Sequence, residues 1–145
     1  MKEKDKESFS LMITMPRDLF EDDDLKKLRL ILASKEGLIK KALGVKRLTV
    51  KATKDEVSFP WFDRVLTADE ANTYTELVSK LCQMAKEQKR VLNKKTTTDN
   101  EKYSFRTFLL RLGFIGDAHK LNRKILLQNL EGSSAFRHER EVENV

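Results

Sequence analysis

Residues 22–44 read DDDLKKLRLILASKEGLIKKALG, and the spacing of the apolar residues in this stretch decides the fold. On a helical wheel of about 100° per residue, these residues fall in one sector. That sector holds Leu25, Leu28, Ile31, Leu32, Leu38, Ile39, Ala42 and Leu43. Because it stays in phase across Gly37, we predict one helix over about 23–43. Three aspartates suit its N-terminal end, and Gly44 suits its C-terminal stop.

Strand patterns lie on both sides of this helix. Residues 9–15 alternate apolar and polar side chains up to Pro16, which predicts a strand. Residues 48–53 and 57–61 also alternate, and the short link between them predicts a β-hairpin without the usual glycine. Pro60 places the end of the second hairpin strand at a sheet edge. The helix must cover one face of the sheet to bury its apolar side.

The second half of the chain carries helical signals. Thr67 and Glu70 form a capping box that predicts a helix reaching about Leu92. Residues 93–100 are polar and predict a loop. Thr98 and Glu101 offer a second capping box for the next helix.

The last two predicted helices are separated by a short link that contains glycine. The first ends at Gly113, and the second runs from Asp117 to Leu130. A helix-turn-helix that reads DNA fits this spacing poorly, and a plain helical hairpin is favoured. We expect Phe136 to fold back over the end of the last helix.

Together these patterns predict an α+β protein. A small three-stranded sheet with a covering helix, in the order β-α-β-β, precedes three α-helices. Residues 1–66 form the strand-helix-hairpin subunit and residues 67–145 the helical subunit. We expect the two subunits to share one core.

The composition favours a protein of a reducing compartment. The 145 residues include one cysteine, Cys82, so no disulfide can form within the chain. No stretch approaches the ~18 consecutive apolar residues of a membrane span, and the first residues do not resemble a signal peptide. We therefore predict a cytoplasmic location without membrane association.

Few residues suit catalysis. The histidines are His119 and His138, and Cys82 lies at the edge of an apolar helix face, where a structural role is favoured. The sequence has neither zinc-ligand spacing nor a phosphate-binding glycine loop. Residues 22–24 could hold a divalent cation, but three aspartates more often form a solvated helix start. We predict a non-enzymatic protein without a metal or cofactor.

Positive charge accumulates after the first residues. The net charge is +6 overall, with −4 in residues 1–24, +7 in 25–66 and +4 in 101–140. Basic faces of this kind can bind nucleic acid phosphates, although an ordinary solvated helix face looks the same. The candidate nucleic-acid-binding residues are Lys120, Arg123, Lys124, Arg106 and Lys102.

An aromatic cluster offers an alternative function. Phe59, Trp61 and Phe62 lie within four consecutive residues. Core packing is the favoured interpretation. If the rings are exposed instead, they could dock a protein partner, and the protein would act as an adaptor or regulator.

Several segments resemble a known family. They are 38–44 (LIKKALG), 58–62 (SFPWF), 105–117 (FRTFLLRLGFIGD), 123–127 (RKILL) and 133–136 (SSAF). They are similar to an uncharacterised family labelled "virulence-related protein", found in phage-like and conjugative elements of Gram-positive bacteria. The likeness spans residues 9–137. The likeness implies an accessory protein of a mobile element. Together with the basic helix faces, it predicts binding to nucleic acid, a nucleoprotein complex or a protein encoded by the same element. It implies no catalytic residues.

Overall fold

The computed structural model describes residues 8–91 and 99–133, and within them the α+β class is confirmed. The strands are β1 (Ser8–Ser10), β2 (Ile13–Pro16), β3 (Lys51–Ala52), β4 (Glu56–Phe59) and β5 (Val65–Thr67). The α-helices are α2 (Asp22–Ser34), α3 (Glu36–Leu43), α4 (Ala68–Glu87), α5 (Glu101–Leu112) and α6 (Lys120–Leu127). Short 3-10 helices, η1 (Arg17–Leu19) and η2 (Asp117–His119), precede α2 and α6. Most of the predicted 93–100 loop, His138 and the proposed fold-back of Phe136 lie outside the described residues.

The predicted hairpin forms as β3 and β4, which belong to a three-stranded antiparallel sheet. Its strand order is β2-β4-β3, with Met15 opposite Val57 and Ala52 opposite the other side of Val57. The turn needs no glycine because the Thr53 hydroxyl accepts the backbone N–H of Glu56 at 3.1 Å, while the Thr53 N–H donates to the Glu56 carbonyl at 2.8 Å. β4 is the central strand of this sheet, but its last residue, Phe59, pairs with β2 alone, so Pro60 follows a strand end that has a neighbouring strand on one side only.

The predicted strand over 9–15 is divided in two. β1 pairs with β5 in a separate two-stranded sheet, and β2 pairs with β4. Pro60 follows β4 directly and has no N–H to donate, so the β2-β4 ladder cannot continue past it. The partner strand resumes only at Val65, and β1 pairs there.

The single helix predicted over 23–43 is also divided. Lys35, with φ −109° and ψ 18°, leaves the helical conformation between α2 and α3. The apolar sector stays in phase, because the Lys35 N–H donates to the Ile31 carbonyl and the Lys35 carbonyl accepts from the Ile39 N–H. All eight predicted apolar residues are buried. The burial prediction is therefore confirmed, and the continuous helix is wrong.

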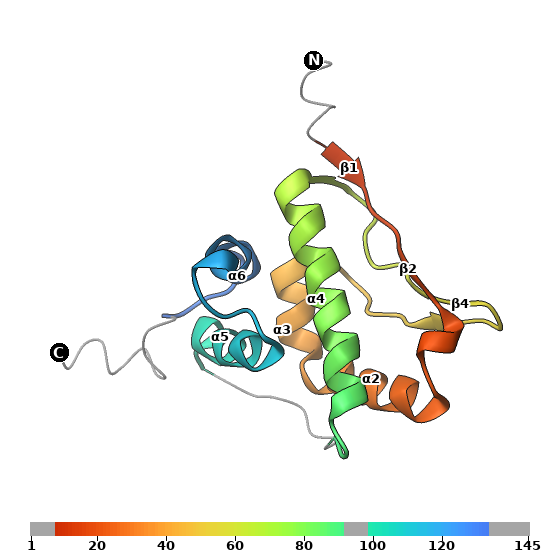
Figure 1. The fold of residues 1–145 in the computed structure, drawn as a ribbon. Coiled ribbons are helices and arrows are strands. Elements are labelled where there is room, and N and C mark those ends of the chain that lie inside the picture. The colour runs from red at the N-terminus through yellow and green to blue at the C-terminus, as the bar shows by residue number, and fades with distance from the viewer. Residues whose placement is uncertain (1–7, 92–98, 134–145) are drawn as a thin grey trace.

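Helix α4 is the central element of the fold (Figure 1). The strands lie to one side of it and α5 and α6 to the other, while α2 packs against it near its C-terminal end. Its capping box is confirmed, because the Thr67 side chain accepts from the Glu70 N–H and the Glu70 carboxylate accepts from the Thr67 N–H. The helix ends at Glu87 rather than at the predicted Leu92. Buried side chains from both predicted subunits form one cluster around it.

The start of α5 differs from the prediction. Its N-cap is Asn100, whose side-chain oxygen accepts the Tyr103 N–H at 3.1 Å and the Ser133 N–H at 3.1 Å. Glu101 does not complete a capping box. Its carboxylate accepts the Glu131 N–H at 3.0 Å and pairs with Lys41 at 2.9 Å. The end of α5 at Gly113 is confirmed. The last predicted helix is shorter than expected and consists of η2 and α6.

No helix in the described residues is both long enough and apolar enough to cross a membrane.

Candidate nucleic-acid interface

Part of the predicted basic face of α6 is used in hydrogen bonds within the protein. Lys120 and Lys124 are exposed. Arg123 is half-buried, and its guanidinium donates to the carbonyls of Phe114 at 2.9 Å and Gly116 at 3.0 Å. Arg123 therefore fixes the link between α5 and α6.

The other two predicted basic residues lie on α5. Lys102 and Arg106 are half-buried there. Within residues 8–91 and 99–133, no hydrogen bond, ion pair or ring contact connects either of them to Lys120 or Lys124. The five residues named from the sequence are therefore not joined into one site by any such contact.

The aromatic cluster is part of the core. Phe59 is fully buried and Trp61 is 4% exposed, with their ring centroids 5.6 Å apart in an edge-to-face arrangement. The Trp61 indole N–H donates to the Thr49 carbonyl at 2.8 Å. Phe62 is half-buried and stacks on Tyr74 at 5.1 Å. Phe59 and Trp61 offer no exposed ring to a protein partner, so their placement gives no support to the adaptor alternative.

Cys82 and His119 both occupy structural positions. Burial raises the pKa of the Cys82 thiol to about 12, so the thiol stays protonated at neutral pH. The Nδ1 of His119 lies 3.0 Å from the Asn122 side-chain oxygen, and the Asn122 amide donates to the Thr73 hydroxyl at 2.9 Å. This chain of side chains connects α6 to α4.

The aspartates at the start of α2 bind cationic side chains of the protein itself. Asp22 pairs with Arg17 at 2.6 Å, and the Lys27 ammonium lies 3.6 Å from Asp23 and 4.0 Å from Asp24. The Asp24 carboxylate also accepts the Glu21 N–H at 3.0 Å. Within the described residues, no group of three or more potential metal ligands is found.

The structure reveals a basic pocket that the sequence did not indicate. It has a volume of about 360 Å³ and lies between the C-terminal ends of α2 and α4 and the last turns of α5. Its basic side chains are Lys35, Arg90 and Arg111. Among the described residues that line it there is no aspartate or glutamate.

Two of these cations share one aromatic ring. The Lys35 ammonium lies 5.3 Å from the centroid of Phe108, and the Arg111 guanidinium carbon lies 5.6 Å from the same centroid. Both contacts lie within the range of cation–π attraction. Burial, and then the charge of Arg111, lower the pKa of Lys35 below its ordinary value of 10.5. The protein thus holds two like charges against one ring, and either charge is stabilised by an anion that enters the pocket.

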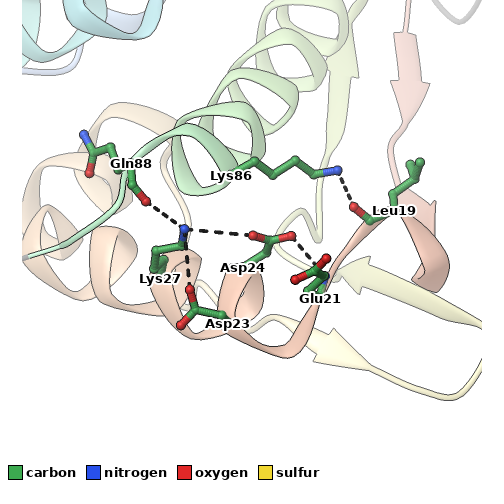
Figure 2. Close-up of polar contacts among 7 residues, drawn as sticks. All are labelled: Leu19, Glu21, Asp23, Asp24, Lys27, Lys86 and Gln88. Carbon is green, nitrogen blue, oxygen red and sulfur yellow. Dashed lines mark hydrogen bonds and ion pairs between the residues drawn. The ribbon is translucent and has the colours of Figure 1, made fainter.

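A polar network positions the α4 side of the pocket. Figure 2 shows the Lys27 ammonium donating to the Gln88 carbonyl, at 2.7 Å, beside the carboxylates of Asp23 and Asp24. Nearby, the Lys86 ammonium donates to the Leu19 carbonyl. Since Gln88 is the C-cap of α4 and also lines the pocket, these contacts hold the helix end next to α2.

A second hollow, of about 330 Å³, lies on another side of α2 and contains Arg29, Lys40 and Arg47. Two of these cations already have protein partners. Arg29 donates to the Val50 carbonyl at 2.9 Å, and Lys40 pairs with Glu36, which also lines the hollow. The pocket beside Phe108 therefore suits an external anion better.

Sequence patterns could not reveal this pocket. Lys35, Arg90 and Arg111 come from three separate segments, and no spacing rule connects them. The only signal was the excess of positive charge in residues 25–66 and 101–140, which contain Lys35 and Arg111. That signal gives the sign of the charge and not its position.

Comparison with known proteins adds no relative, since no protein-family model, curated protein or solved structure matches this chain.

Proposed function

We propose that this chain is a non-catalytic accessory protein of a mobile genetic element, and that it binds nucleic acid or a nucleoprotein complex in the cytoplasm. The single observation that carries the proposal is the convergence of Lys35, Arg90 and Arg111 on one pocket without a lining carboxylate among the described residues. Phosphate oxygens are well suited to such a site, because guanidinium groups bind them through paired hydrogen bonds.

The overall charge of the protein supports a polyanion rather than a small inorganic anion. The protein carries a net charge of +6, and Lys120 and Lys124 add exposed positive charge on α6. A phosphate backbone can contact several such groups at once, and its binding then depends strongly on salt. The likeness of residues 38–44, 58–62 and 105–117 to a family of mobile-element proteins favours the same class of partner.

The test is the salt dependence of nucleic-acid binding. Fluorescence anisotropy with a labelled oligonucleotide gives the binding constant of the wild type at several salt concentrations. A triple variant, Lys35→Gln, Arg90→Gln and Arg111→Gln, should bind more weakly for every sequence. Its slope of log K against log salt should be flatter than that of the wild type, because the cations that neutralise phosphate charge at the pocket are lost.

A matched control separates the pocket from total charge. The variant Lys26→Gln, Lys46→Gln and Lys54→Gln removes three exposed cations, so both triple variants have a net charge of +3 instead of +6. We expect the control to keep a steeper salt slope than the pocket variant. Equal affinities and slopes for the two variants would remove the pocket from the proposal, and absence of binding by the wild type would overturn the function itself.

A further inference from the structure

The positive charge of the pocket beside Phe108 exceeds the negative charge of one internal phosphodiester. A phosphodiester has one negative charge, whereas a phosphate monoester has about −1.5 to −2 near pH 7. We propose that the pocket binds a phosphate monoester of nucleotide size, with the phosphate between Lys35, Arg90 and Arg111. This inference rests on the proposed function and deepens it, because it names the phosphate group that the pocket distinguishes.

The donor set fits a monoester. Arg90 and Arg111 each present a planar fork that can bind two phosphate oxygens, and Lys35 adds a point charge. A monoester has three terminal oxygens, whereas an internal phosphodiester has only two that are free of ester bonds. Three cations around one phosphate therefore have the most acceptor oxygens available when that phosphate is at the end of a strand or on a free nucleotide.

The volume and the walls fit more than a bare phosphate. About 360 Å³ lies in the range of small-ligand pockets, which runs from about 300 to 1,000 Å³. Besides its cations, the pocket is lined by the apolar side chains of Ile31, Met84 and Val91. Apolar surface beside a cluster of cations suits a ligand with an anionic end and a flat, weakly polar body, such as a nucleotide.

The pocket also reaches the protein interior. Phe108, one of its lining residues, is 2% exposed and belongs to the core. Arg90 and Arg111, by contrast, are exposed, so a phosphate can reach the cations from solvent while the lining extends to the core.

The relief of repulsion between Lys35 and Arg111 gives the site its preference for high negative charge. Both cations rest on the same ring, and no carboxylate among the described lining residues separates them. A dianion neutralises more of this repulsion than a monoanion does. Discrimination between the two ligands should therefore exceed what one additional hydrogen bond supplies.

The experiment compares strand ends. Oligonucleotides of one sequence carry a phosphate at the 5′ end, a phosphate at the 3′ end, or hydroxyl groups at both ends, and binding to the full chain is measured by anisotropy. We expect at least one of the two phosphorylated oligonucleotides to bind more tightly than the oligonucleotide with hydroxyl ends, by about tenfold or more. The triple pocket variant should lose this difference, and the Lys26, Lys46 and Lys54 control should retain it.

Further outcomes separate this inference from the proposed function. Equal affinity for all three oligonucleotides overturns the monoester site and leaves nucleic-acid binding intact. A nucleoside monophosphate, titrated alone by calorimetry, tests the other source of the same chemistry. If it binds to the wild type and not to the pocket variant while no oligonucleotide binds, the monoester site stands and the proposed function fails. If neither ligand binds, both proposals are overturned.

Discussion

At the scale of single residues, the pocket depends on an ammonium and a guanidinium that the fold holds against one ring. Like charges at short range disfavour each other's ionised state, and burial adds to this effect. The aromatic face of Phe108 offsets part of the cost through cation–π attraction. An entering anion therefore meets two cationic side chains that the fold already holds against one ring.

The pKa of Lys35 provides a direct check of this arrangement. Arg111→Gln removes the neighbouring charge and leaves the burial of Lys35, so the pKa of Lys35 should rise toward 10.5. NMR titration of the Lys35 ammonium in both proteins measures the change. A pKa of Lys35 that stays the same in the variant would contradict the proximity of the two cations.

The same shift has a consequence for stability. Because the folded-state pKa of Lys35 is lowered, the unfolded chain binds more protons at this residue between the lowered pKa and 10.5. The unfavourable contribution of Lys35 is fully present below the folded-state pKa. The free energy of unfolding therefore rises as pH increases through that window, and Arg111→Gln should make this rise smaller.

At the scale of elements, Arg123 is a structural residue of the α5–α6 link. Its guanidinium binds two carbonyls of the link, whereas the neighbouring Lys124 is exposed on α6. The link contains Gly113 and Gly116, both with positive φ, which only glycine adopts without strain. Such a segment has little intrinsic preference for one conformation, and the arginine supplies contacts that select one.

Replacing these adjacent residues should have different effects. Arg123→Ala should lower the free energy of unfolding by about 1–2 kcal/mol, because two hydrogen bonds from a charged donor are lost. Lys124→Ala should change it by no more than about 0.5 kcal/mol. Urea unfolding followed by circular dichroism measures both. A variant of Arg123 as stable as the variant of Lys124 would show that the link does not need these contacts.

Element positions also show how far the sequence alone could lead. The apolar faces of the helices could be predicted from the sequence. A helical wheel shows which side chains share a face, even where the backbone between them leaves the helical conformation. The break at Lys35 could not, because the hydrogen bonds around it keep the face in phase. The strand divides because β1 pairs with β5 and β2 pairs with β4, and both partners lie far along the chain. The alternation of apolar and polar residues within 9–15 carries no information about those partners.

The candidate site was less accessible to prediction than the fold. Basic residues on one helix, such as Lys120 and Lys124, can be recognised from spacing. Lys35, Arg90 and Arg111 converge only after α2, α4 and α5 have packed together, so their relation is tertiary. The burial of Phe59 and Trp61 was the favoured interpretation of the aromatic cluster, and it is confirmed.

At the scale of the whole molecule, the pocket is a product of both halves of the chain. Lys35 follows α2 in the first half, whereas Arg90 and Arg111 belong to the second. One cluster of buried side chains connects the halves, with α4 at its centre (Figure 1). The pocket therefore requires the packed molecule, and neither half alone presents its three cations together.

The most direct test of the central claim is an NMR titration that locates bound nucleic acid on the protein. Side-chain resonances of lysine and arginine in labelled protein are followed as an unlabelled oligonucleotide is added. The account predicts the largest shifts at Lys35, Arg90 and Arg111, with smaller shifts at Lys120 and Lys124. Large shifts confined to Lys120 and Lys124, with the pocket resonances unmoved, would contradict it.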